Sequence, residues 1–285
     1  MLIFCNGMLR SGSAFQFNLV CSLLEKTSSC KRHGRWEPKE KFTQNQLNLW
    51  AKDKNTFHVI KSGRNAEEFQ MANNNLAKMI YINRDLRDVA VAAKFKWSLS
   101  EDNLIEMLDR ALLGYEVMIE NNAFISDWCL HQKYEEVYND TRNAVRQIAS
   151  FLDLNPSNEI IEDVVKECSI DNMLQVSESI SVTVPQNLLR ILGKLASYVK
   201  TFLPPPYNES WKLRKYYLKI LPKVDSKTVI APRHIEPTRG MPGAWKDELT
   251  LFEIKAIVYR YKDYLSKEGY LSENDQNNLY NLDNQ

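Results

Sequence analysis

The sequence predicts an α/β fold in three layers, with a central parallel sheet of about five strands between flanking helices. Short apolar runs recur along the first half of the chain, and charged sequence that can form a helix follows each of them. Such runs are typical of a parallel sheet that is covered on both faces. Right-handed crossovers bring the carboxyl ends of the strands to one edge of the sheet, where ligands bind. The fold class therefore also predicts where a site should lie.

The first strand is expected over residues 2–5 and the first helix over residues 13–26. In this helix Phe15, Leu19 and Leu23 recur at the spacing that places apolar side chains on one face. Further strands are expected over residues 56–61, 78–82 and 126–131, and a further helix over about residues 141–152.

The composition is that of a globular protein with a substantial core. The chain has 285 residues, of which 44% are hydrophobic and 26% charged, so we expect residues 1–285 to form a single domain. The formal net charge is only +1, which gives no global field to attract nucleic acid or an acidic membrane. No apolar run approaches the ~18 residues that span a bilayer, and stable membrane insertion is not expected.

Five cysteines are spread along the chain without a Cys-x-x-Cys pair. Their odd number and wide spacing indicate neither a disulfide framework nor a zinc site. The sequence enters the first strand directly after Met1, which leaves no room for a signal peptide. We therefore expect a reduced, cytoplasmic protein.

Residues 7–12, called the phosphate loop below, join the first strand to the first helix. Gly7 and Gly12 allow a tight turn, so that successive N–H groups and the positive end of the helix dipole can face one anion. A Walker A loop would continue Gly-Lys-Ser/Thr. Here Ser13 and Ala14 follow Gly12, and the cation, Arg10, lies inside the loop. This order favours a phosphosulfate over a metal-bound triphosphate.

A second cluster of charged residues begins where the strand over residues 78–82 ends. Arg84 lies at the predicted ligand edge, and its planar guanidinium suits a phosphate dianion. Asp85 and Asp88 can cap the next helix or hold Arg87 in place. Taken alone, the cluster is better explained by helix capping and surface ion pairs than by phosphate binding.

The third segment comprises residues 234–246, and residues 238–245 within it are called the C-terminal loop below. They follow His234 and include Arg239, Gly240, Gly243 and Trp245, ahead of a terminal helix. The glycines would let the backbone approach a bound anion closely.

Together these segments resemble the sulfotransferase family that uses 3′-phosphoadenosine 5′-phosphosulfate (PAPS), with the bacterial small-molecule or natural-product type as the nearest fit. Arg10-Ser11-Gly12-Ser13 matches the family's first loop, and residues 84–91 match its Arg-Asn/Asp-Pro-Arg/Lys-Asp-Val-Ala-Val stretch. Residues 132–136 and 238–246 are similar to two later family segments. The resemblance implies a P-loop-like sulfotransferase fold with a mainly helical insertion.

The resemblance also assigns cofactor contacts. It implies that PAPS, and the product 3′-phosphoadenosine 5′-phosphate (PAP), is held by Arg10, Ser11, Gly12, Ser13, Ala14, Arg84, Ala92, Tyr134, Thr238, Arg239 and Gly240. Tyr134 would lie near the adenine. Ala92 replaces a serine that commonly binds the 3′-phosphate, and Thr238 replaces an arginine. No metal is implied, and the sequence has no His or Asp cluster with metal-ligand spacing.

Catalysis by positioned cations is expected, by analogy with phosphoryl transfer. Arg10 and Lys61 are the candidates, since Lys61-Ser62 matches the first two residues of the family's Lys-Thr/Ser-His motif. The third residue, the family's catalytic histidine, is Gly63 in this chain.

The resemblance therefore does not identify the general base. Candidates are His33 and Glu37, in the polar segment after the first helix, and Glu67, just beyond Lys61, since the resemblance includes sulfotransferases that use a glutamate as the base. His58 lies inside an apolar strand and is interpreted as a core histidine.

Residues 171–232 diverge from the family and are predicted to form a lid or insertion. An amphipathic stretch over residues 188–199 fits three roles: a lid over the acceptor pocket, a homodimer contact, or attachment to a membrane or carrier protein. We favour the lid. Candidates to line the pocket are Trp36, Trp50, Trp97 and Trp211.

The sequence thus predicts a sulfotransferase that acts on the hydroxyl or amine of a small-molecule acceptor, as in natural-product tailoring. Paralytic shellfish toxin biosynthesis is one example of such a setting. The alternative is a nucleotide-binding protein with lost or altered catalysis, indicated by Gly63 and Ala92. A nucleotide kinase fits less well, because it would need a Walker lysine and a magnesium site.

Overall fold

A computed structural model describes residues 1–35, 42–62, 66–97, 101–181 and 240–271, together with residues 228, 235 and 238. Most of the predicted insertion over residues 171–232 lies outside this part, which contains only residues 171–181 and Thr228 from it.

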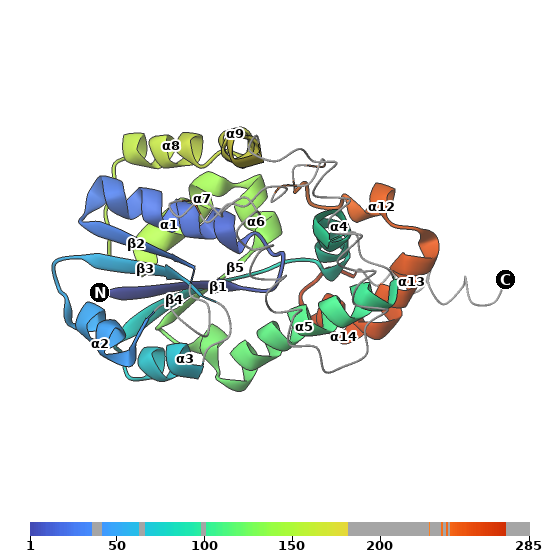
Figure 1. Ribbon diagram of the computed structural model, residues 1–285, viewed down its shortest axis with the longest axis horizontal. Coiled ribbons are helices and arrows are strands. Elements are labelled where there is room, and N and C mark those ends of the chain that lie inside the picture. Colours follow the sequence, from blue (N-terminus) through green and yellow to red (C-terminus); the bar gives the residue numbers. More distant parts are fainter. Residues whose placement is uncertain are drawn as a thin grey trace, which may run out of the picture.

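The centre of the molecule is a five-stranded parallel sheet in the order β2-β3-β1-β4-β5, which confirms the predicted fold class (Figure 1). The strands are β1 (Leu2–Gly7), β2 (Cys30–Arg35), β3 (Phe57–Lys61), β4 (Ala77–Asn83) and β5 (Cys129–Lys133). Their carboxyl ends lie at one edge, where Cys5 pairs with Lys61 and Asn83 pairs with Lys133.

Two details of the sheet differ from the sequence prediction. β2 was not expected, because Cys-Lys-Arg-His-Gly-Arg has no apolar run. It pairs only with β3 and forms an edge of the sheet, where polar strands are tolerated. The strand predicted over residues 126–131 begins later, at Cys129, because a 3₁₀ turn (Ala123–Ile125) and the bends after it precede it.

Helices cover both faces of the sheet (Figure 1). One face carries α1 (Ser13–Thr27), α6 (Tyr134–Asn139), α7 (Thr141–Phe151) and α8 (Asn158–Glu167), with α9 (Ile170–Ser181) beyond them. The other carries α2 (Gln44–Lys52), α3 (Ala66–Asn73) and α5 (Glu101–Glu120). Beside the carboxyl edge lie α4 (Leu86–Trp97), α12 (Trp245–Glu248), α13 (Leu251–Arg260) and α14 (Lys262–Lys267).

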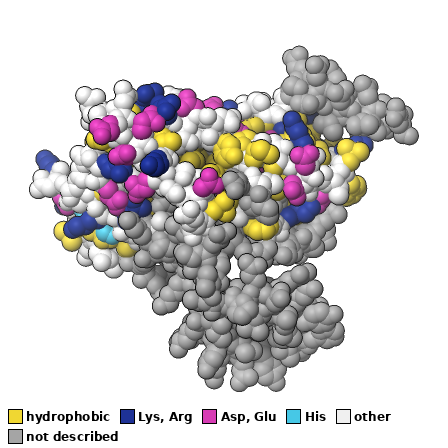
Figure 2. Space-filling view, turned by 90° about the horizontal axis from the view of Figure 1, so that it is seen from above, with side chains coloured by type: hydrophobic (Ala, Val, Ile, Leu, Met, Phe, Trp, Pro, Cys, Tyr) yellow, Lys and Arg dark blue, Asp and Glu magenta, His cyan; other side chains and the backbone are white. Residues whose placement is uncertain are grey.

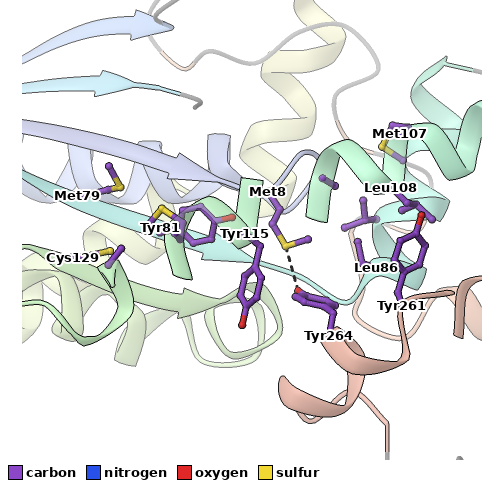
Figure 3. Packing of buried hydrophobic residues seen from close by; sticks show 14 of the residues in the cluster. Met8, Met79, Tyr81, Leu86, Met107, Leu108, Tyr115, Cys129, Tyr261 and Tyr264 are labelled. Carbon is purple, nitrogen blue, oxygen red and sulfur yellow. Dashed lines mark hydrogen bonds between the residues drawn. The ribbon is translucent and has the colours of Figure 1, made fainter. Parts of the chain in front are cut away.

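The core consists of two apolar clusters, one on each face of the sheet. Alternate residues of β1 separate them: Ile3 and Cys5 pack toward α1, whereas Leu2 and Phe4 pack toward α2. On the second face Met8 contacts the carboxyl-terminal helix α14, where the Tyr264 hydroxyl lies 3.3 Å from its sulfur (Figure 3). Helix α14 is thus packed against the phosphate loop.

The surface carries charges of both signs, as the net charge of +1 predicts. On the face shown in Figure 2, basic and acidic side chains are intermixed over the described helices. Among the described helices, none is both long and apolar enough to cross a membrane. All five cysteines are free thiols.

Candidate functional site

The phosphate loop is closed by hydrogen bonds from Ser11. Its buried hydroxyl lies 2.7 Å from the Met8 carbonyl and 2.9 Å from the Ile82 carbonyl at the end of β4. The Ser11 N–H also donates to the Met8 carbonyl, at 3.2 Å. The hydroxyl and the N–H of Ser11 are therefore both bonded within the protein. The contribution of Ser11 to a ligand site is to fix the shape of the loop.

Glycine is required where this loop enters α1. Gly12 has a φ of +82°, and a Cβ at this position would lie 2.4 Å from a ring carbon of Tyr134. The first α-helical bond runs from the Gln16 N–H to the Gly12 carbonyl. The N–H groups of Ser13 and Ala14 precede this bond, at the positive end of the helix dipole. The loop thus has the geometry of an anion site.

Lys61 reaches this helix end from β3. Its Nζ donates to the Ser13 hydroxyl at 2.9 Å. Burial lowers the pKa of Lys61 to about 8, and the positive charge of Arg35 adds to this effect. The structure therefore brings two predicted site residues together, with a lysine that is still protonated near neutral pH.

Arg84 joins the phosphate loop to the C-terminal loop. Its side chain is buried, with Nη1 3.4 Å from the Arg10 carbonyl and Nη2 3.1 Å from the Gly240 carbonyl. The guanidinium carbon lies 4.4 Å from the centre of the Tyr134 ring. Four segments that are far apart in sequence thus meet at one cation.

Asp88 anchors the C-terminal loop. Its carboxylate accepts the N–H groups of Gly243 at 2.7 Å and Trp245 at 3.0 Å. Burial raises the pKa of Asp88, while the charge of Arg84 opposes that shift. Asp88 therefore holds the loop beside Arg84.

Asp85 and Arg87 form a buried ion pair at the start of α4. The closest contact, between Arg87 Nη2 and Asp85 Oδ2, is 2.6 Å, and the Arg87 N–H also donates to Asp85. The Arg87 guanidinium stacks 3.9 Å from the Trp245 ring. For these two residues the structure shows capping and pairing, whereas Arg84 contacts the phosphate loop.

Ala92 and Thr238, two of the three residues that depart from the family pattern, also lie in this region. Ala92 is fully buried in α4, one turn after Asp88, and its methyl group offers no hydrogen bond. Thr238 Oγ1 is buried and has no hydrogen-bond partner within the described part of the chain. Arg239 lies outside the described residues.

Comparison with known proteins then identifies the family. The sequence model of a family described as "Sulfotransferase domain" matches residues 7–192, which is more than half of the chain. The chain belongs to the sulfotransferase family.

Individual relatives of this sulfotransferase are distant. An amine sulfotransferase of Oryctolagus cuniculus is 27% identical over 117 residues, which is 35% of this chain and 38% of that protein. The match thus spans well under half of that relative.

Solved structures share the fold over most of the chain. Mouse sulfotransferase SULT7A1 complexed with PAP has a TM-score of 0.55 at 14% identity, over 93% of this chain and 84% of that one. Retinol dehydratase in complex with androsterone and inactive cofactor PAP has a TM-score of 0.53 at 16% identity, over 93% and 80%. These likenesses confirm the P-loop-like sulfotransferase fold.

The structure places the candidates for the base in different settings. His33 lies in β2, where its ring stacks on Trp50 at 3.8 Å and its Nε2 lies 2.9 Å from Nδ1 of His58. His58 is buried and hydrogen-bonded, as expected of a core histidine. Glu37, the side chain of Glu67 and the glycine at position 63 lie outside the described residues.

One buried carboxylate at the edge was missed from sequence. Glu68 is fully buried in α3 and accepts hydrogen bonds from Asn6 at 3.0 Å and from the Ser62 hydroxyl at 2.8 Å. It also lies close enough to Lys61 to raise that residue's pKa. Glu68 lies on the same face of α3 as the buried Ala72, four residues later. This spacing could have indicated from the sequence that Glu68 is buried.

We expect Gly12→Ala to reduce PAP affinity at least ~10-fold, because the new Cβ would strike the Tyr134 ring and the residue would keep a positive φ, at a cost of about 1–3 kcal/mol for the backbone alone. Gly269→Ala is the matched control. Gly269 has a φ of +75° but nothing within 4 Å of a Cβ. Calorimetric titration of both variants tests the prediction, and equal PAP affinities would contradict it.

Proposed function

We propose that this protein transfers a sulfuryl group from PAPS to a hydroxyl or amine of a small-molecule acceptor. The observation that carries the proposal is the position of Arg84, whose buried guanidinium bonds the phosphate loop and the C-terminal loop at once. A nucleotide with phosphates on both sides of its ribose fits this arrangement. One phosphate would meet the start of α1, and the other would meet Arg84.

The residues present fit PAPS at both ends. Ser13 and Ala14 would offer N–H groups to the phosphosulfate, with Arg10 and Lys61 as its cations. Arg84, Thr238 and Gly240 would hold the 3′-phosphate, and the buried Thr238 hydroxyl, without a partner among the described residues, favours a polar ligand there. Tyr134 lies between the phosphate loop and Arg84, where its ring would support a nucleotide.

When bound, PAPS supplies a sulfuryl group that is activated by its attachment to a phosphate. The protein's task is to stabilise the charge that develops on that phosphate. Lys61 and the first N–H groups of α1 are held in place before the reaction, Lys61 by its bond to Ser13. Preorganised donors of this kind contribute about 10²–10³-fold each to turnover.

The names of related proteins support the class of acceptor. The rabbit relative is named an amine sulfotransferase, and retinol dehydratase has been solved with androsterone and with retinol. These names favour a small organic acceptor. Natural-product tailoring, with paralytic shellfish toxins as an example, is proposed from the motif resemblance, and a cytoplasmic location from the free thiols.

Calorimetry with PAP and with ATP and Mg²⁺ tests the ligand class, and mass spectrometry of a phenol, a primary alcohol and a primary amine incubated with PAPS tests the reaction. We expect PAP to bind more tightly than ATP and at least one acceptor to gain a sulfate. Tighter binding of ATP would overturn the cofactor assignment. PAP binding without any sulfated product would favour the nucleotide-binding alternative.

We expect PAP affinity to fall as pH rises through 8, because Lys61, with its pKa lowered to about 8, loses its charge there. The PAP phosphates stay dianionic over the range. In the unliganded protein the lowered pKa of Lys61 makes the free energy of unfolding rise between pH 8 and 10.5. Over this range Lys61 is protonated in the unfolded chain and neutral in the folded protein. Titrations at pH 7 and 9 measure the effect.

Lys61→Met should remove most of this pH dependence. The charges that act on Lys61 in the protein come from Arg35, Glu68 and Arg10, and the variant leaves all three in place. The same fall in affinity in wild type and variant would show that another group causes it.

A further inference from the structure

We infer that Glu68 is a positioning residue of this sulfotransferase, which ties the ends of β1 and β3 together beside the phosphate loop and balances the positive charge of Lys61. The inference rests on the proposed function, because a cationic Lys61 matters there as a partner of PAPS. Glu68 is fully buried in α3, so it acts through its neighbours rather than by contact with a ligand.

The ends of two strands donate hydrogen bonds to one oxygen of Glu68. Asn6 Nδ2, in β1, lies 3.0 Å from Glu68 Oε2, and the hydroxyl of Ser62, which directly follows β3, lies 2.8 Å from the same oxygen. Asn6 and Ser62 come one residue after Cys5 and Lys61, which pair in register. The carboxylate therefore joins the two strands just beyond this pair, at the carboxyl edge of the sheet.

The phosphate loop fixes the amide of Asn6. The N–H of Gly7, the first residue of that loop, donates to Asn6 Oδ1 at 2.7 Å. A backbone N–H can only donate, so the amide oxygen of Asn6 faces Gly7 and its NH₂ group faces Glu68. Glu68 thus receives an N–H from Asn6 and the hydroxyl proton of Ser62. Hydrogen bonds donated to a carboxylate favour its ionised form.

Lys61 and Ser62 leave the end of β3 toward opposite faces of the sheet. Lys61 Nζ donates to the Ser13 hydroxyl at the start of α1, whereas the Ser62 hydroxyl donates to Glu68 in α3. Glu68 is therefore bonded to the residue next to Lys61. It holds the part of the backbone from which the Lys61 side chain extends.

Glu68 also opposes the positive charges around Lys61. Burial lowers the pKa of Lys61, and the charges of Arg35 and Arg10 lower it further. Burial raises the pKa of the neighbouring Cys5, so this thiol stays neutral. In the part of the chain that the structure describes, Glu68 is the carboxylate whose charge acts on Lys61, and it favours the protonated amine. Without Glu68, Lys61 would lose its proton at a lower pH.

The two effects of Glu68 serve the same step. A cation that stabilises the charge developing on the leaving phosphate must be protonated and must be in place before the reaction. The negative charge of Glu68 favours the protonated form of Lys61, and its hydrogen bonds hold the strand end. A purely structural role would leave the titration of Lys61 unchanged when the carboxylate becomes an amide.

Carbon NMR of labelled lysine side chains measures the titration of Lys61 in the protein without ligand, with the signal assigned by its loss in Lys61→Met. Glu68→Gln keeps an oxygen that can accept hydrogen bonds and removes the charge. We expect the midpoint of the Lys61 titration to fall by about one pH unit in this variant, the low end of the effect of one nearby opposite charge. An unchanged midpoint would overturn the inference.

Two further variants serve as controls. Ser62→Ala removes one hydrogen bond to Glu68 but leaves its charge, and the Lys61 midpoint should stay close to that of the wild type. Asp127→Asn removes an exposed carboxylate two residues before β5, at the amino edge of the sheet, and should leave the midpoint unchanged. A shift in Ser62→Ala as large as that in Glu68→Gln would show that packing, rather than charge, sets the titration, and would contradict the inference.

The pH dependence of PAP binding connects Glu68 to the site. In the wild type the fall in PAP affinity should begin near pH 8, where Lys61 loses its proton. In Glu68→Gln it should begin about one pH unit lower, in step with the NMR titration. A fall that begins at the same pH in both proteins would argue against the role of Glu68.

The outcomes separate this inference from the proposed function. If the wild type binds no PAP at any pH, the proposed function fails, and the NMR titration still decides whether Glu68 balances Lys61. If the wild type binds PAP and Glu68→Gln leaves the Lys61 midpoint unchanged, the function stands and the role of Glu68 is wrong. If Glu68→Gln does not fold, carbon NMR of the wild-type Glu68 carboxyl decides. We expect an ionised carboxylate at about pH 7, and a protonated one would overturn the inference.

Discussion

The buried guanidinium of Arg84 is the contact on which the candidate site depends. It bonds a carbonyl of the phosphate loop and a carbonyl of the C-terminal loop, and it lies over the Tyr134 ring. Two buried carboxylates also feel its charge: burial raises the pKa of Asp88 and of Glu135, and the positive charge of Arg84 opposes that rise in both. Asp88, whose pKa responds to Arg84, is occupied by two backbone N–H groups. We propose a phosphate dianion as the ligand at Arg84, beside the C-terminal loop that Asp88 holds in place.

Helix α14 in turn holds Arg84. The Tyr264 hydroxyl donates to the Arg84 carbonyl at 2.8 Å, across 180 residues of sequence, and also lies beside Met8 (Figure 3). Asn83, the last residue of β4, donates to Glu268 at 2.9 Å. The helix α14 thus supports the carboxyl end of β4 from the side opposite to α1. The sheet positions the site residues. Contacts between residues far apart in the sequence then hold the end of β4 and Met8 against α14.

Sequence reasoning found what local patterns determine. The apolar runs of β1, β3 and β4 and the glycines of the phosphate loop are visible in short windows, and they gave the fold class and the position of Arg84. It missed β2, whose polar residues form a strand only because β3 offers an edge. It also missed Glu68 and read His58 as a core residue alone, without its bonds to Asp53 and His33. The partners of His58 are set by strand register and by the placement of α2, which no spacing in the sequence encodes. The roles of the predicted cofactor residues stay predictions.

A crystal structure of the protein with PAP would test the central claim most directly. The account predicts that the 3′-phosphate lies within hydrogen-bond distance of the Arg84 guanidinium and that the 5′-phosphate lies at the N–H groups of Ser13 and Ala14, beside Lys61. A nucleotide bound in the reverse orientation, or away from Arg84, would contradict it.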